Sequence, residues 1–189
     1  MEPTHIGRKR RWARENTRGE IFGAMKRKEV YATTGTRLLV RVFAGFDFVA
    51  DDIQRHDFAK YGYQKGVPMS GDLSQAPNGK APTLMIRALR DVDGANLDRV
   101  QIVKGWMDKK GKLHEKVYDV AWSDDREMGA DGKLPPVGNT VDVANASYTN
   151  TIGAPLLLAY WHMSSSLVLC SPPRKNAWAT RARSARLDL

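Results

Sequence analysis

Short runs of alternating apolar and polar residues dominate the chain and predict β-strands. In the segment Arg37–Phe43, Leu38, Val40 and Val42 fall on one side of an extended chain, and the residues between them fall on the other. Comparable segments, separated by Gly, Asp and Pro, occur at Glu29–Thr33, Thr83–Leu89, Arg99–Trp106, Leu113–Trp122 and Thr140–Ala146. Several short strands joined by polar turns predict a mainly β fold, in which an antiparallel β-sandwich-like domain follows one short helix.

That helix is predicted at Glu15–Lys28. Thr17 and Glu20 have the spacing of a capping box, which marks a helix start. The apolar residues of this segment share one helix face, and they are Ile21, Phe22 and Met25. We expect this face to pack against something, because the glycines in the segment make an isolated helix weak.

The turns between segments indicate how the strands are connected. Thr34–Thr36 is predicted as the turn between the first two strands, and Thr83–Leu89 is expected to pair with Arg99–Trp106 across a polar turn. The connection 44–81 is rich in Gly, Pro and Asp, and it is too long to be a plain loop in a compact domain. It is therefore predicted to be either a packed, partly structured excursion or a mobile segment.

Composition divides the chain into four segments. Residues 1–14 are predicted to be a basic N-terminal extension, 15–43 a helix with strands, and 44–155 the β-sandwich-like domain. From Leu156 onward the Ser-, Ala- and Arg-rich composition predicts a poorly structured basic tail over residues 156–189.

The net charge of +9 lies at the two ends of the chain. Residues 1–28 carry nine Lys and Arg against three Glu, residues 156–189 carry five against one Asp, and residues 29–155 come to −1. A nucleic-acid-binding domain usually concentrates basic residues on one folded face. The distribution therefore indicates solvated ends and predicts no specific nucleic-acid binding.

Other composition signals narrow the class of protein. The single Cys170 excludes an internal disulfide framework, and no apolar run approaches the ~20 residues of a membrane helix. Residues 1–7 lack the apolar stretch of a signal peptide, so none is expected, and the localisation stays open.

The turn at residues 33–37 holds the first candidate binding residues. The hydroxyls of Thr33 and Thr34 could orient a substrate oxygen, and the Arg37 guanidinium could bind a carboxylate or phosphate. A tight turn explains the same residues more simply, because Gly35 permits an unusual backbone conformation and threonines satisfy backbone groups.

Two tryptophans in predicted strands are the second set of candidates. Trp106 and Trp122 could form an aromatic platform for a sugar, although tryptophans in strands are more often part of the core. Near them, His114 falls on the opposite strand face from Glu115 and Asp119, so a histidine–carboxylate pair is not expected within the strand.

No catalytic residue and no metal site is predicted. The acidic residues Asp124, Asp125 and Asp131 resemble a loose calcium loop, but their spacing fits no EF-hand pattern, and solvated loop carboxylates are the simpler interpretation.

A series of ordered motifs carries a resemblance to a known family. These are ENTR (residues 15–18), KRKEVYATTGTR (26–37), KGVPMSGDL (65–73), DGANLDRVQIVKGW (93–106), HEKVYDVAWS (114–123), GKLPPVGNTVDV (132–143) and YTNTIGAP (148–155). In this combination the chain resembles the bacterial domain-of-unknown-function 3604 family. The resemblance covers about Trp12 to Pro155, and the residues after Pro155 depart from it.

The resemblance implies a relationship to metal-dependent hydrolases of the polymerase and histidinol phosphatase (PHP) superfamily. Such proteins bind divalent metal through an early His-x-His and a late Asp-x-His motif, and this chain has neither. The chain is therefore expected to be a C-terminal portion that needs no cofactor and is non-catalytic alone, so whether it is an enzyme is left open. Complete members are the ones expected to hold metal, and they can be exported.

Two alternatives to an inert accessory fragment stay open. One is a β-sandwich module that binds a carbohydrate or a protein. The other is a subunit that docks on a separately encoded PHP-like catalytic half through the exposed helix face of Ile21, Phe22 and Met25.

Overall fold

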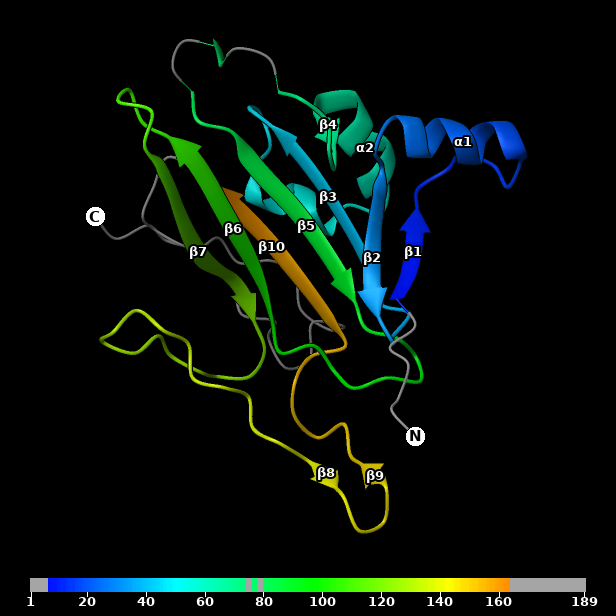
Figure 1. Ribbon diagram of the computed structural model, residues 1–189, viewed down its shortest axis with the longest axis vertical. Coiled ribbons are helices and arrows are strands. Elements are labelled where there is room, and N and C mark those ends of the chain that lie inside the picture. Colours follow the sequence, from blue (N-terminus) through cyan, green and yellow to red (C-terminus); the bar gives the residue numbers. More distant parts are fainter. Residues whose placement is uncertain (1–6, 74–75, 78–79, 164–189) are drawn as a thin grey trace.

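The computed structural model describes residues 7–73, 76–77 and 80–163, which form a mainly β protein with short helices (Figure 1). The N-terminal elements are β1 (Gly7–Arg11), α1 (Arg18–Lys26), β2 (Val30–Thr34) and β3 (Leu39–Gly45). The 3-10 helix η1 (Ala50–Gln54), α2 (Phe58–Lys65), β4 (Val67–Pro68) and β5 (Thr83–Leu89) follow. The remaining strands are β6 (Arg99–Met107), β7 (Leu113–Trp122), β8 (Val141–Asp142), β9 (Ser147–Tyr148) and β10 (Leu156–His162).

A four-stranded antiparallel sheet is the centre of the fold, with the strand order β10-β5-β3-β4. Its register aligns Val42 of β3 with Ile86 of β5 and Ala159 of β10. On the next rung, Phe43 aligns with Met85, and Met85 with Tyr160. Because neighbouring residues alternate between faces, the first rung lies on one face of the sheet and the second on the other.

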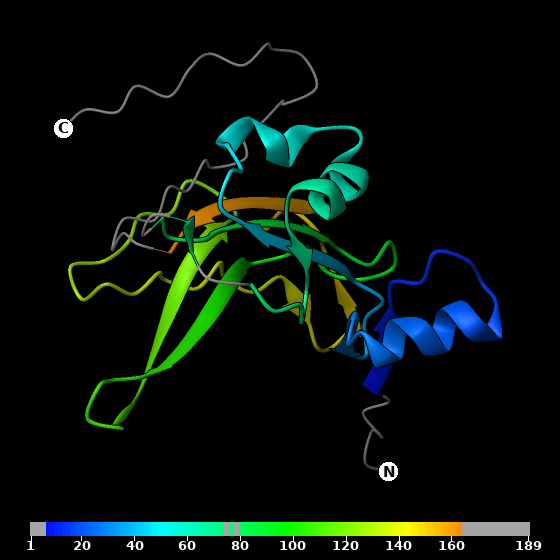
Figure 2. The ribbon, with the colours of Figure 1, turned by 90° about the horizontal axis from the view of Figure 1, so that it is seen from above.

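Each face of this sheet has its own core. On one face, η1 and α2 cover a cluster formed by Phe43, Phe48, Ile53, Phe58 and Met85. On the other face, the β6–β7 hairpin covers a cluster formed by Ile86, Ala88, Val120, Ala121, Ala154, Leu157, Ala159 and Trp161. Figure 2 shows these layers, with the helices above the sheet and the hairpin below it. The antiparallel, mainly β prediction is confirmed, whereas a sandwich of two full sheets stays a prediction.

The last strand corrects the expectation of a poorly structured segment from Leu156. Leu156–His162 form β10, and its inward residues Leu157 and Trp161 are almost completely buried. The run is apolar on both sides because β10 contributes to both cores, with Leu158 and Tyr160 packing under the helices. The predicted tail beyond residue 163 lies outside the described residues.

The strand pairing also differs from the prediction. β2 pairs with β1 instead of β3, so the turn Thr34–Thr36 does not close a hairpin. β5 pairs with β3 and β10, and β6 pairs with β7. The physical reason is that β5 is buried on both faces, which requires a central position in the sheet.

The elements β1, α1 and β2 lie together beside the central sheet, and we call them the N-terminal ledge. The basic segment predicted as an extension contains β1, and α1 follows with Thr17 as its N-cap, whose hydroxyl accepts a hydrogen bond from the Glu20 backbone N–H at 3.3 Å. The helix buries Ala24 and leaves Phe22 and Met25 62% and 50% exposed. The predicted helix is confirmed, and it is shorter at both ends.

Two further segments now have defined structure. The long connection 44–81 contains η1, α2 and β4, so the packed alternative is correct for the part of it that is described. In place of a strand at Thr140–Ala146, a small hairpin joins β8 to β9.

No helix in the described part of the chain is long and apolar enough to cross a membrane.

Candidate functional site

A buried carboxylate joins the N-terminal ledge to the body of the protein. Glu29, just before β2, is 3% exposed. Its Oε2 accepts a hydrogen bond from the Tyr63 hydroxyl at 2.9 Å, and its Oε1 accepts one from Arg27 Nε at 3.3 Å. Arg41 Nη2 donates to the same Tyr63 hydroxyl at 3.1 Å. Burial, and secondly the hydrogen bond to Glu29, raises the pKa of Tyr63, so this group stays a neutral donor at ordinary pH.

Aromatic rings surround the cation of this network. The Arg41 guanidinium lies 4.3 Å from the centroid of the Trp12 ring and 5.3 Å from that of Tyr63. Trp12 in turn donates its indole N–H to the Val40 carbonyl at 3.1 Å. The arrangement attaches β1, β2 and α1 to the edge of the central sheet. These contacts give the arrangement a structural role.

The candidates at the turn after β2 are not brought together. Thr33 is 4% exposed, and its hydroxyl is buried without a hydrogen-bond partner among the described residues, so a ligand in solution does not reach it. Thr34 is exposed, and its carbonyl accepts from the Thr36 N–H at 3.0 Å in a turn where Gly35 has a φ of 79°. The tight-turn interpretation describes these contacts.

Arg37 is held by the loop that follows β5. Its backbone N–H donates to Asp91 Oδ2 at 2.5 Å, its Nε lies 3.5 Å from the same oxygen, and its guanidinium forms an ion pair with Asp93. The hydrogen bond from the Arg37 backbone is the main cause that lowers the pKa of Asp91. Arg37 therefore already has carboxylate partners within the chain.

This contact predicts an acid-dependent loss of stability. Because the folded pKa of Asp91 is lowered, its contribution is fully present above the ordinary carboxyl pKa of about 4 and is lost as the pH falls through the folded value. We expect Asp91→Asn to melt below the wild type at pH 7, with a difference that shrinks towards pH 2. Thermal melts followed by circular dichroism from pH 7 to pH 2 measure it.

Asp72 provides the matched control for this comparison. It is exposed and makes no hydrogen bond or ion pair within the described ranges, so Asp72→Asn should follow the wild type at every pH. A difference between Asp91→Asn and the wild type that does not change with pH would contradict the role assigned to Asp91.

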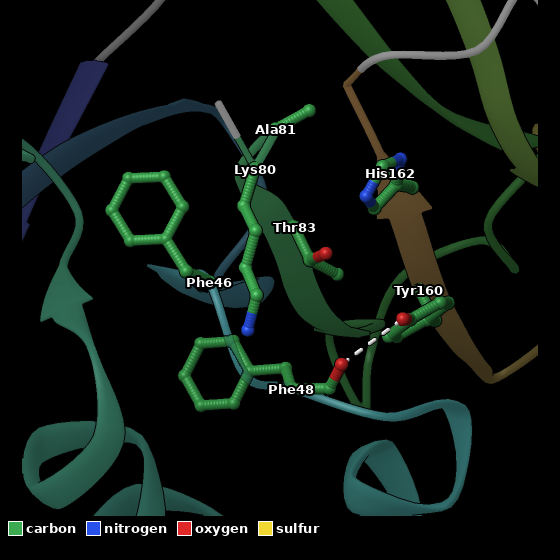
Figure 3. Close-up of a pocket in the computed structure, with 7 residues that line it drawn as sticks. All are labelled: Phe46, Phe48, Lys80, Ala81, Thr83, Tyr160 and His162. Carbon is green, nitrogen blue, oxygen red and sulfur yellow. Dashed lines mark hydrogen bonds between the residues drawn. The ribbon is translucent and has the colours of Figure 1, made fainter. Parts of the chain in front are cut away.

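An open hollow of about 460 Å³ lies at one end of the central sheet (Figure 3). Three segments far apart in sequence line it: the residues after β3, the start of β5 and the end of β10. Its lining residues are Phe46, Phe48, Lys80, Ala81, Thr83, Tyr160 and His162. Tyr160 donates to the Phe48 carbonyl at 3.0 Å, and Lys80 forms an ion pair with Asp47 at 2.9 Å.

The hollow combines aromatic and polar side chains. Its lining offers two phenyl rings, the Thr83 hydroxyl, the Lys80 ammonium, the Tyr160 phenol and the His162 imidazole. The hydrogen bond from Lys80, and secondly its charge, lowers the pKa of Asp47, so this carboxylate stays ionised at neutral pH. Sequence reasoning missed this hollow, since no local motif joins the three segments.

The two candidate tryptophans lie at opposite ends of the β6–β7 hairpin. Trp106 pairs with His114 near the tip, whereas Trp122 pairs with Arg99 at the base. Trp122 is half-buried, and its indole N–H donates to the Arg126 carbonyl at 2.9 Å. The two rings therefore do not form one platform, and Trp106 alone is open to a ligand, with 41% of its surface exposed.

His114 has a carboxylate partner from outside its own strand. Its Nε2 lies 2.9 Å from Asp108 Oδ2, which belongs to the turn between β6 and β7. The other oxygen of Asp108 accepts the backbone N–H groups of Lys110 and Lys112. The hydrogen bond to His114 is the first cause that lowers the pKa of Asp108. The pair closes the hairpin turn, with a carboxylate that comes from the turn itself.

The acidic loop residues considered for calcium do not converge. Asp124 Oδ2 accepts from the Gly153 backbone N–H at 2.9 Å, and Asp131 Oδ1 accepts from the Lys133 backbone N–H at 3.1 Å. Within residues 7–73, 76–77 and 80–163, no group of three or more His, Cys, Asp or Glu side chains could hold a metal ion. These carboxylates act as backbone acceptors in loops.

The chain matches a known protein family. Residues 5–164 match a protein family described as "Protein of unknown function (DUF3604)". The match includes β10, so similarity to the family extends past Pro155, where the sequence motifs ended. No curated protein and no solved structure matches the chain.

Proposed function

Because the chain belongs to the DUF3604 family of proteins of unknown function, we propose that it is a non-catalytic β domain that docks on a PHP-like, metal-dependent catalytic half. The exposed apolar face of α1 is the observation that carries this proposal. The KEVYATTGTR motif supports it, because the resemblance to PHP-like proteins implies that this stretch follows the metal-binding half. The motif runs from the end of α1 through β2 in this chain, so the catalytic half would join here.

The α1 surface has the character of a protein contact. A shallow depression of about 530 Å³ is lined by Arg18, Gly19, Ile21, Phe22 and Met25. Exposed apolar side chains gathered on one short helix are typical of an interface. The helix α1 itself lies to one side of the central sheet (Figure 2).

Charge indicates the kind of partner. Arg18 lines the depression and Lys26 ends the helix; both are exposed and form no ion pair within the described residues. Acidic residues around an apolar patch on the partner would complement them and speed up association. The proposed occupant is therefore a catalytic half with an acid-rimmed apolar surface.

Disruption of this face should abolish the complex. We expect the chain to co-elute in size-exclusion chromatography with a separately produced metal-binding half of a complete family member. The double variant Phe22→Glu/Met25→Glu should lose that association, because it places two carboxylates in the apolar contact. Val143, 86% exposed in the β8–β9 turn, gives a control, and Val143→Glu should leave the complex intact.

Three results would overturn the proposal. One is failure of the wild-type chain to co-elute with any such half. Another is binding of the α1 face to anionic lipid vesicles in place of the protein. The third is metal-dependent hydrolysis of phosphomonoester or phosphodiester substrates by the purified chain alone, which would remove the non-catalytic role.

A further inference from the structure

One face of the β6–β7 hairpin changes character along its length. Near the base, Ile102 and Tyr118 form a rung that packs on the core, with Tyr118 5.1 Å from the ring of Trp161. The next two rungs towards the tip share this face, and they are Lys104 opposite Lys116 and Trp106 opposite His114. We call these four residues the lysine–tryptophan face. In Figure 2 the hairpin diverges from the sheet towards its tip, where this face lies.

The pairing of Lys104 with Lys116 is electrostatically unfavourable by itself. Like charges directly opposite each other on one face of an antiparallel pair destabilise it. Neither Lys104 nor Lys116 forms an ion pair within the described ranges. The ammonium of Lys104 lies 5.6 Å from the Trp106 ring centroid, and that of Lys116 lies 4.9 Å from the Tyr118 ring centroid. Aromatic faces therefore hold the cations in place without neutralising them.

The carboxylates of the hairpin do not relieve this charge. Glu115 lies opposite Gly105 on the other face of the hairpin. Asp119 accepts a hydrogen bond from Gln101 at 2.8 Å, also on that other face. Asp108 at the tip is bound to His114 and to the turn backbone. Two adjacent cations thus stay available for an external anion.

We propose that the lysine–tryptophan face binds an acidic polysaccharide. Carboxylate or sulfate groups would bind between Lys104 and Lys116, and the apolar side of a neighbouring sugar ring would contact the exposed part of Trp106. Successive rungs on one face are about 7 Å apart, which places the charged and aromatic contacts within two or three sugar units. This function goes beyond docking through α1, which lies at the opposite side of the molecule (Figure 1).

An acidic glycan fits this face better than single-stranded nucleic acid does. Nucleic-acid grooves stack successive bases on a series of aromatic side chains. Here Trp106 is the exposed indole of the face, and its ring lies parallel to that of His114, at 5.3 Å and 14°. One aromatic contact beside a pair of cations matches one sugar ring with its acidic neighbour.

The test measures binding of the full chain to four probes by isothermal titration calorimetry. The probes are an alginate hexasaccharide, a heparin hexasaccharide, the neutral cellohexaose and an oligothymidylate of matched length. We expect binding of at least one acidic glycan, weakened on the order of tenfold in Lys104→Gln/Lys116→Gln, which removes charge-assisted contacts. Trp106→Ala should weaken it by a similar factor.

The matched control removes the same charge from the same hairpin. Lys109 and Lys110 are exposed in the turn and lie off the lysine–tryptophan face. Lys109→Gln/Lys110→Gln should keep most of the affinity, and thermal melts confirm that each variant is folded. An equal loss in this control would overturn the proposal in favour of non-specific attraction to the positive charge of the hairpin. Equal binding of cellohexaose, tighter binding of oligothymidylate or no binding of either acidic glycan would also overturn it.

Discussion

Trp161→Ala is expected to lower the free energy of unfolding by about 3 kcal/mol, which would leave little stability in a domain of this size. Trp161 is 1% exposed and packs between the central sheet and the hairpin, against Tyr118. Its removal leaves a large cavity in that core. The expected loss is at the lower end of the range for tryptophan, because the indole N–H is buried without a partner among the described residues and its burial cost disappears as well.

Urea denaturation followed by circular dichroism measures this effect. Trp106→Ala is the matched control, since it removes the same side chain from a strand position that is 41% exposed, and it should cost less than about 1 kcal/mol. The free energy of unfolding of Trp161→Phe should fall between those of the wild type and Trp161→Ala, because this variant keeps an aromatic ring and removes the unpaired N–H. Equal stability of Trp161→Ala and Trp106→Ala would show that β10 is not part of the core.

Gly62→Ala is expected to destabilise the protein by about 2 kcal/mol, although alanine is the better helix former. A Cβ at position 62 of α2 would lie 2.4 Å from ring atoms of Phe43, closer than any normal carbon–carbon contact. The Phe43 ring cannot move aside, because it is fully buried and contacts the rings of Phe58 and Tyr63 edge-on. Overpacking of this kind costs about 1–3 kcal/mol or more and outweighs the helix propensity gain of up to about 1 kcal/mol.

Gly19→Ala in α1 tests the same substitution without the clash. A Cβ there meets nothing within 4 Å, so the propensity gain should appear alone and raise stability slightly. In urea denaturation, Gly62→Ala should lower the free energy of unfolding and Gly19→Ala should raise it. A stabilising Gly62→Ala would show that α2 does not pack closely on β3.

The sequence predicted the elements whose signals are local. The alternation in β3 placed Val40 and Val42 on one face and Phe43 on the other, and the two cores contain them in that arrangement. The Thr17–Glu20 spacing marked the start of α1 in the same way. Such signals depend on neighbouring residues, so a single sequence is enough to interpret them.

The strand partners and β10 could not be obtained in this way. Residues 156–162 are apolar on both sides because they contact two cores, and a continuous apolar run lacks the alternation that predicts a strand. The basic composition of the residues that follow then led to the expectation of a poorly structured tail. β5 likewise takes its partners from segments about 45 and 75 residues away, which turn chemistry does not encode.

The candidate site residues show the same difference between local signals and contacts with distant residues. Arg37 was singled out for its guanidinium, but its partners Asp91 and Asp93 are more than 50 residues away, and their positions decide that it stabilises a loop. The buried Glu29 and the hollow beside Thr83 were missed for the same reason. In contrast, Trp106 was found from its strand position alone, and its exposure keeps it a candidate.

The position of β10 as the last strand of the sheet has a consequence for biosynthesis. β10 completes both cores, and Tyr160 binds the Phe48 carbonyl across 112 positions of sequence. A nascent chain that ends before residue 162 therefore exposes the backbone edge of β5 and two half-formed apolar surfaces. Folding during translation must wait for this strand, and prematurely terminated chains should be captured by chaperones or aggregate.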